Sequence, residues 1–169
     1  TQHRVTACGA VLNLSFDNEM LQREVIKSGA ISLLLHYVED NMNNNNLSLM
    51  ATNAISCLLD VDDGVASFIT SKGCKIFVKA LKHSSGELTT SLADCLKSLS
   101  EEDGMKQALV TENCVDILQD IISTNMLFNN KGDVLEKLKI SVDLIILLLG
   151  DDNCLGKLFA EENNIFIDK

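Results

Sequence analysis

The sequence contains no proline and no tryptophan, and aromatic residues make up only 4% of it. Proline removes a backbone donor and clashes inside a helix, so its absence favours an all-helical chain. The longest apolar run, Leu144–Leu149, is far shorter than the roughly 20 residues that a membrane-spanning helix needs. The first residues do not resemble a signal peptide. We therefore expect a soluble protein of the cytosol that does not insert into a membrane.

Paired cysteine motifs are also missing. The cysteines are Cys8, Cys57, Cys74, Cys95, Cys114 and Cys154. They fall within or beside predicted helices, no CxxC pair occurs, and no histidine lies at metal-binding spacing from a cysteine pair. We predict that all six are small buried thiols in a reducing compartment, with no disulfide and no bound metal.

Catalytic motifs cannot be assembled from this sequence. It has no glycine-rich phosphate loop, no pair of catalytic acids, and no nucleophile with a candidate base. The sequence therefore predicts a non-catalytic binding protein without a cofactor. The formal net charge of −10 argues against a general nucleic-acid binder, which would be basic.

The sequence does contain an internal repeat. An apolar stripe of helical spacing, formed by Ala7, Ala10, Val11 and Leu14, recurs at three later places. The matching stripes are Ala51, Ala54, Ile55 and Leu58, then Leu92, Cys95, Leu96 and Leu99, and then Ser141, Leu144, Ile145 and Leu148. A period of about 40 to 47 residues with two or three helices per repeat is typical of armadillo and HEAT arrays, and the repeats of this chain are roughly 40 to 49 residues long.

The repeat predicts an all-α fold, an armadillo-type right-handed superhelix (α-solenoid) of about three to four repeats. We predict that Ala10, Ala54, Cys95 and Leu144 are buried at equivalent positions of this superhelix. Natural ends of such arrays carry polar capping helices, and neither end of this chain has that character. Residues 1–169 are therefore interpreted as a single armadillo-repeat segment of a longer array.

A turn before the middle helix of each repeat also recurs. Gly29, Gly73, Asn113 and Asn163 each stand before an apolar run, and glycine and asparagine adopt positive φ most easily. Each is therefore predicted to end a helix. The expected helices are 20–26, 30–38, 65–72, 75–82, 87–99, 105–112, 115–123 and 134–149, with polar loops at 41–46 and 129–133.

An acidic turn follows the last helix of every repeat. The acidic turns contain Asp17 and Glu19, then Asp60, Asp62 and Asp63, then Glu101, Glu102 and Asp103, and finally Asp151 and Asp152. Such residues can cap and favourably charge the N-terminus of the next helix. Three together repel one another, so the alternative interpretation is an acidic ridge that attracts a basic partner.

The last helix of each repeat is expected to line the concave groove of the superhelix. Its outward positions are Asn13, Cys57, Ser98 and Leu147, and one turn earlier Gly9, Asn53, Asp94 and Asp143. The regular asparagine ladder of nuclear-import receptors is absent, which argues against a receptor for basic import signals. Asp94 and Asp143 would lie in neighbouring repeats as a carboxylate pair. The simpler alternative is that each is a solvated polar residue of its helix.

Residues 7–19 and 138–151 resemble the smgGDS family, the armadillo-repeat GDP dissociation stimulators of small GTPases. The second stretch is the more specific, through its Ser-x-Asp-Leu core, its leucine run and its Gly-Asp end. The resemblance covers the whole chain but only part of the family's array. It implies a cytosolic binding protein for Rho-, Rac- and Rap-type GTPases that carry a basic C-terminal tail and a prenyl group. It implies a guanine nucleotide exchange factor for some GTPases and an escort for others, without covalent chemistry.

The candidate partner-binding residues are the polar positions of the groove and the acidic turns. They are Asn13, Asn53, Asp60, Asp62, Asp63, Asp94, Ser98, Glu101, Glu102, Asp103, Asp143, Asp151 and Asp152. The alternative function is a general armadillo scaffold that binds an extended peptide in its groove. No interruption of the apolar pattern marks a prenyl pocket.

Overall fold

The computed structural model describes residues 2–40, 45–100, 108–109, 113–126 and 132–149. The helices are α1 (Gln2–Ser15), α2 (Glu19–Lys27), α3 (Ala30–Asp40), α4 (Asn45–Leu58), α5 (Asp62–Thr70), α6 (Gly73–His83), α7 (Glu87–Ser100), α9 (Cys114–Met126) and α10 (Gly132–Leu149). Within the described ranges no residue belongs to a β-strand. The predicted all-α fold is confirmed.

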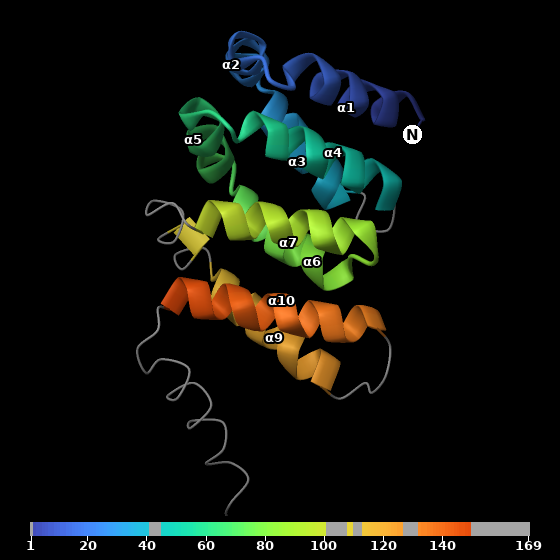
Figure 1. The fold of residues 1–169 in the computed structure, drawn as a ribbon, viewed down its shortest axis with the longest axis vertical. Coiled ribbons are helices and arrows are strands. Elements are labelled where there is room, and N and C mark those ends of the chain that lie inside the picture. Colours follow the sequence, from blue (N-terminus) through green and yellow to red (C-terminus); the bar gives the residue numbers. More distant parts are fainter. Residues whose placement is uncertain (1, 41–44, 101–107, 110–112, 127–131, 150–169) are drawn as a thin grey trace, which may run out of the picture.

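The helices stack into a solenoid (Figure 1). The last helices of successive repeats, α1, α4, α7 and α10, lie one below another and are here termed the last-helix row. A second row, α3, α6 and α9, lies behind it, and α2 packs on α5 along one side. Each helix of the second row also packs on the last helix of its own repeat. This is the α-solenoid that the repeat predicts.

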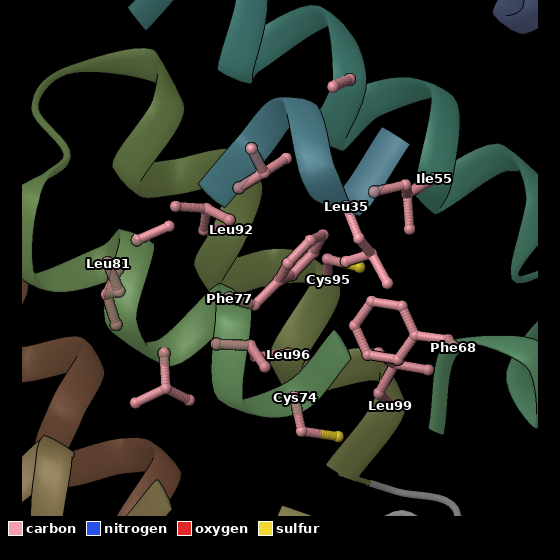
Figure 2. Packing of buried hydrophobic residues seen from close by; sticks show 14 of the residues in the cluster. Leu35, Ile55, Phe68, Cys74, Phe77, Leu81, Leu92, Cys95, Leu96 and Leu99 are labelled. Atoms are coloured by element: carbon pink, nitrogen blue, oxygen red, sulfur yellow. The ribbon is translucent and has the colours of Figure 1, made fainter. Parts of the chain in front are cut away.

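The core runs continuously between these two rows. Figure 2 shows Leu35 and Ile55 of the first complete repeat converging with Phe68 and Phe77 of the second. All four side chains are fully or almost fully buried. The rings of Phe68 and Phe77 meet edge to face with centroids 5.0 Å apart, an arrangement that aromatic pairs prefer. One repeat therefore completes the core of its neighbour, as stacked repeats require.

The predicted helix-ending turns are correct at two of the described positions and displaced at a third. Gly29 and Asn113 have φ of 84° and 56°. In the second complete repeat the left-handed residue is Lys72, with φ of 58°, and not Gly73. Gly73 begins α6, where a Cβ would lie 2.5 Å from the Phe68 ring. Glycine at this position is thus needed for close packing. The predicted stop at Asn163 lies outside the described residues.

One of the four predicted core positions is wrong. Ala54, Cys95 and Leu144 are buried, with exposed fractions of 0%, 5% and 3%, but Ala10 is exposed. Helix α1 turns Cys8 inward instead. Whereas α4 is covered by α3 of its own repeat, α1 packs on α4 and α2. The stripe of α1 has the expected register, but no described helix covers it as α3 covers α4.

The described cysteines are free thiols. Cys8, Cys57, Cys74, Cys95 and Cys114 are all buried, and Cys154 lies outside the described residues. Burial raises the pKa of Cys95 to about 12.

Within the described part of the chain, no helix is long and apolar enough to cross a membrane. The same residues contain no cluster of three or more potential metal ligands.

Candidate partner-binding surface

The acidic turns of two successive repeats lie close together where α2 packs on α5. Arg23 of α2 joins them, because its Nη2 lies 2.8 Å from Oε1 of Glu19 and its Nη1 lies 2.6 Å from Oδ2 of Asp63. The hydrogen bonds to Glu19 and then to Asp63 raise the pKa of Arg23. Stacking therefore aligns the two turns in space. The charge of Asp63 is, however, offset by an arginine of the preceding repeat.

These acidic residues charge the helix N-termini but do not cap them. Asn18 caps α2, where its side chain accepts a hydrogen bond of 3.2 Å from the backbone N–H three residues later. Val61 is the N-cap of α5, and no side chain caps that helix. Asp62 and Asp63 lie in the first turn of α5, where a negative charge is favourable. The capping interpretation is therefore wrong for Asp60, which precedes the cap.

A cleft lies at each of the three junctions of the last-helix row. The cleft between α1 and α4 has a volume of about 320 Å³. The cleft between α4 and α7 measures about 200 Å³, and the cleft between α7 and α10 about 220 Å³. The predicted site residues that line them are Asn53, Asp60, Asp94, Ser98 and Asp143. A succession of clefts along one face of a solenoid suits an extended ligand.

Asp94 and Asp143 line one cleft together, between α7 and α10. The prediction from the sequence placed them in neighbouring repeats. It did not include Lys97 and Lys139, which line the same cleft. Both lysines follow the helical spacing of neighbours, since Lys97 lies three residues after Asp94 and Lys139 lies four residues before Asp143. Positive and negative charges are therefore balanced in this cleft, and it is not an acidic patch.

Asp60 lines both of the other clefts and, among the described residues, is the only charged one in the lining of either. Phe16 and Ser56, which the sequence reasoning missed, line the α1/α4 cleft with it. Phe16 is 73% exposed, although it is a large apolar residue. Ser56 could have been identified from the sequence, because it lies three residues after Asn53 and therefore on the same side of α4. This cleft combines an apolar wall, polar groups and one negative charge.

Two curated proteins from Xenopus laevis are similar to this chain along most of its length. It is 31% identical over 153 residues to Rap1 GTPase-GDP dissociation stimulator 1-B. It is 30% identical over 156 residues to Rap1 GTPase-GDP dissociation stimulator 1-A. Each match covers 90% of this chain. The predicted resemblance to the smgGDS family is confirmed. The chain spans 25% of the length of these relatives, and no protein-family model matches it.

The remaining candidate residues of this smgGDS-like segment are not brought together in the clefts. Asn13 is exposed on α1 and lines none of the three. Asp62 is exposed at the start of α5, also outside their linings. The acidic residues of the later turns lie outside the described residues; they are Glu101, Glu102, Asp103, Asp151 and Asp152. The geometry therefore concentrates the candidate surface on the last-helix row.

Proposed function

We propose that this chain binds a small GTPase and promotes the release of GDP from it. The observation that carries the proposal is its similarity, over 90% of its length, to proteins named as Rap1 GTPase-GDP dissociation stimulators. The chain spans 25% of those relatives. We therefore propose that this segment provides part of the binding surface of a longer armadillo array in the cytosol.

The proposed mechanism is differential binding. A protein that binds the nucleotide-free GTPase more tightly than the GDP-bound form lowers the affinity of that GTPase for GDP by the same factor. Such a mechanism needs no nucleophile, general base or cofactor, and we propose that the chain is non-catalytic. In this mechanism GDP release is promoted by a surface that binds one state of the partner more tightly than the other.

The proposed partner is a prenylated GTPase of the Rap, Rac or Rho type with a basic C-terminal tail. The net charge of −10 attracts such a tail and speeds association. Exposed ion pairs contribute only about 0 to 1 kcal/mol each, so the attraction must be collective and sensitive to salt. Asp60, Asp94 and Asp143 are the described carboxylates that we assign to this surface, with Asn13, Asn53 and Ser98 as its uncharged polar groups.

Two measurements test this function. The chain is immobilised, and its capture of nucleotide-free and GDP-bound Rap1 is compared with its capture of the same two forms of a Rac-type and a Rho-type GTPase. Release of a fluorescent GDP analogue from each GTPase is then followed with and without the chain. We expect preferential capture of the nucleotide-free form and faster release. Equal capture of both forms, without faster release, would contradict the exchange function.

The second candidate function is a scaffold that binds an extended peptide, which the row of clefts favours. A synthetic peptide with the sequence of the GTPase tail separates the two. If the free tail binds as tightly as the whole GTPase, the groove recognises only a peptide. If the whole GTPase binds much more tightly, its folded domain also contributes to the contact.

A further inference from the structure

The carboxylates of the candidate surface differ in the cations that lie beside them. Asp63 is paired with Arg23 at 2.6 Å. Asp94 and Asp143 share their cleft with Lys97 and Lys139, as described above. Within the described part of the chain, Asp60 has no ion pair and neither of its clefts is lined by a basic residue. Of the described carboxylates in the clefts, Asp60 is therefore the one with no described basic residue in the same lining.

One lining residue of the α1/α4 cleft, Cys57, is held by a buried hydrogen bond. Gln22 of α2 is only 3% exposed, and its side-chain amide donates a 3.1 Å hydrogen bond to the backbone oxygen of Cys57. The same nitrogen lies 3.8 Å from the sulfur of Cys57. This buried contact ties the end of α4 to α2, directly next to the cleft lining. A site held in place before binding loses less conformational entropy when a ligand arrives.

The chemistry of the lining changes across this cleft. Leu12 of α1 and Phe16, in the turn directly after α1, provide an apolar wall. Asn53 and Ser56 of α4 provide polar groups, with Asp60 just beyond the end of that helix. A volume of about 320 Å³ is at the lower end of the range of roughly 300 to 1,000 Å³ for small-molecule sites. The cleft therefore has room for one long side chain.

We propose that the α1/α4 cleft receives a single lysine or arginine side chain from a basic segment of a partner protein. Its charged end binds Asp60, and its aliphatic stem lies against Phe16 and Leu12. Lysine and arginine are the side chains that combine an apolar stem with a cationic end. A cation near an aromatic ring gains further attraction. The inference rests on the proposed function in one respect, since the basic tail of a small GTPase is the segment it would receive.

The test uses a fluorescein-labelled octalysine peptide and the intact 169-residue chain, with binding measured by fluorescence anisotropy. Two matched pairs of variants separate the cleft from the general field of the protein. Asp60→Asn and Asp62→Asn remove the same charge two residues apart, but only Asp60 lines a cleft. Phe16→Ala and Leu14→Ala each remove a large exposed apolar side chain, but only Phe16 lines the cleft.

We expect Asp60→Asn to weaken octalysine binding about fivefold at low salt and Asp62→Asn less than about twofold, because only the first loses a direct ion pair. Phe16→Ala should weaken binding and Leu14→Ala should not. In ¹H–¹⁵N NMR spectra, the side-chain amide of Asn53 should shift on titration in the parent but not in Asp60→Asn. All four substituted side chains are exposed, and thermal melting checks that each variant folds like the parent.

Equal losses for Asp60→Asn and Asp62→Asn, or an unmoved Asn53 resonance in the parent, would overturn the proposal in favour of a diffuse acidic field. The same variants are then tested with the small GTPase. If octalysine binding depends on Asp60 but no GTPase binds, the cleft assignment stands and the proposed function fails. If a GTPase binds equally well to both variants, the function stands and the cleft assignment fails.

Discussion

Leu14 and Leu58 occupy the same position in the last helices of successive repeats, yet Leu14 is 63% exposed and Leu58 is fully buried. Both belong to an apolar stripe with the same spacing. The difference lies in what covers the two helices, because α4 has α3 of its own repeat packed against it and also lies between α1 and α7. No helix of the described residues covers α1 in the same way. Burial in a solenoid is thus decided by the helices that pack alongside, whether they belong to the same repeat or to a neighbouring one.

This pair predicts very different responses to the same substitution. Leu58→Ala should lower the free energy of unfolding by about 2 to 5 kcal/mol, because it leaves a cavity in a closed core. Leu14→Ala should change it by less than about 0.5 kcal/mol, as is usual for exposed positions. Urea denaturation followed by circular dichroism measures both. A loss at Leu14 as large as the loss at Leu58 would mean that a second copy of the chain covers α1 in solution.

Gly64 and Gly9 should respond in opposite directions to substitution by alanine. A Cβ at Gly64 would lie 1.8 Å from the carbonyl oxygen of Leu58, which is backbone and has little freedom to move. Gly64→Ala should therefore destabilise the fold by about 1 to 3 kcal/mol, since α5 must shift. A Cβ at Gly9 would lie 3.4 Å from the flexible end of Met50, so Gly9→Ala should stabilise α1 by up to about 1 kcal/mol. Melting temperatures that move in the same direction for both variants would refute this assignment.

Lys72 is held in the left-handed region, with φ of 58°, where a side chain is strained and glycine is not. Lys72→Gly should therefore raise the free energy of unfolding by roughly 1 kcal/mol. Lys79→Gly is the matched control, because Lys79 lies in the interior of α6, where glycine is unfavourable by about 1 kcal/mol. In chemical denaturation, Lys72→Gly should be more stable than the parent and Lys79→Gly should be less stable. If both are destabilised, the turn does not have this backbone conformation.

Cys95 predicts a loss of stability at alkaline pH. Burial raises the pKa of its thiol to about 12 from an ordinary value of 9.0. Between these values the unfolded chain has released the proton and the folded chain still holds it. Stability is therefore fully present below about pH 9 and falls above it, by at most about 1.4 kcal/mol per pH unit.

The variant Cys95→Ala separates this effect from the titration of other groups. From pH 7 to pH 8.5 the free energy of unfolding should change with pH equally in the variant and in the parent. Above pH 9 it should fall less steeply in the variant. Denaturation curves at a series of pH values give both slopes. Identical slopes above pH 9 would show that Cys95 does not retain its proton in the folded protein.

The sequence by itself determined the helices and their repetition. The spacing of apolar residues predicted a helix over 87–99, and α7 spans Glu87–Ser100. This succeeds because helical periodicity is a property of consecutive residues. The family resemblance was likewise readable from local stretches. The displaced turn at Lys72 shows the limit of such reasoning, since the sequence does not reveal that Gly73 is needed against the Phe68 ring.

Only the tertiary structure decided which surfaces are covered and which charges remain unpaired. Ala10 has the same register as Ala54 but not the same burial, because burial depends on the helix that lies alongside. Asp63 meets an arginine 40 residues earlier in the chain, whereas Asp60 meets none among the described residues. Coulomb interactions depend on separation in space, and stacking of the repeats sets that separation. The sequence predicted a row of acidic turns, but the packing of the repeats determined which of the described carboxylates meets a basic side chain.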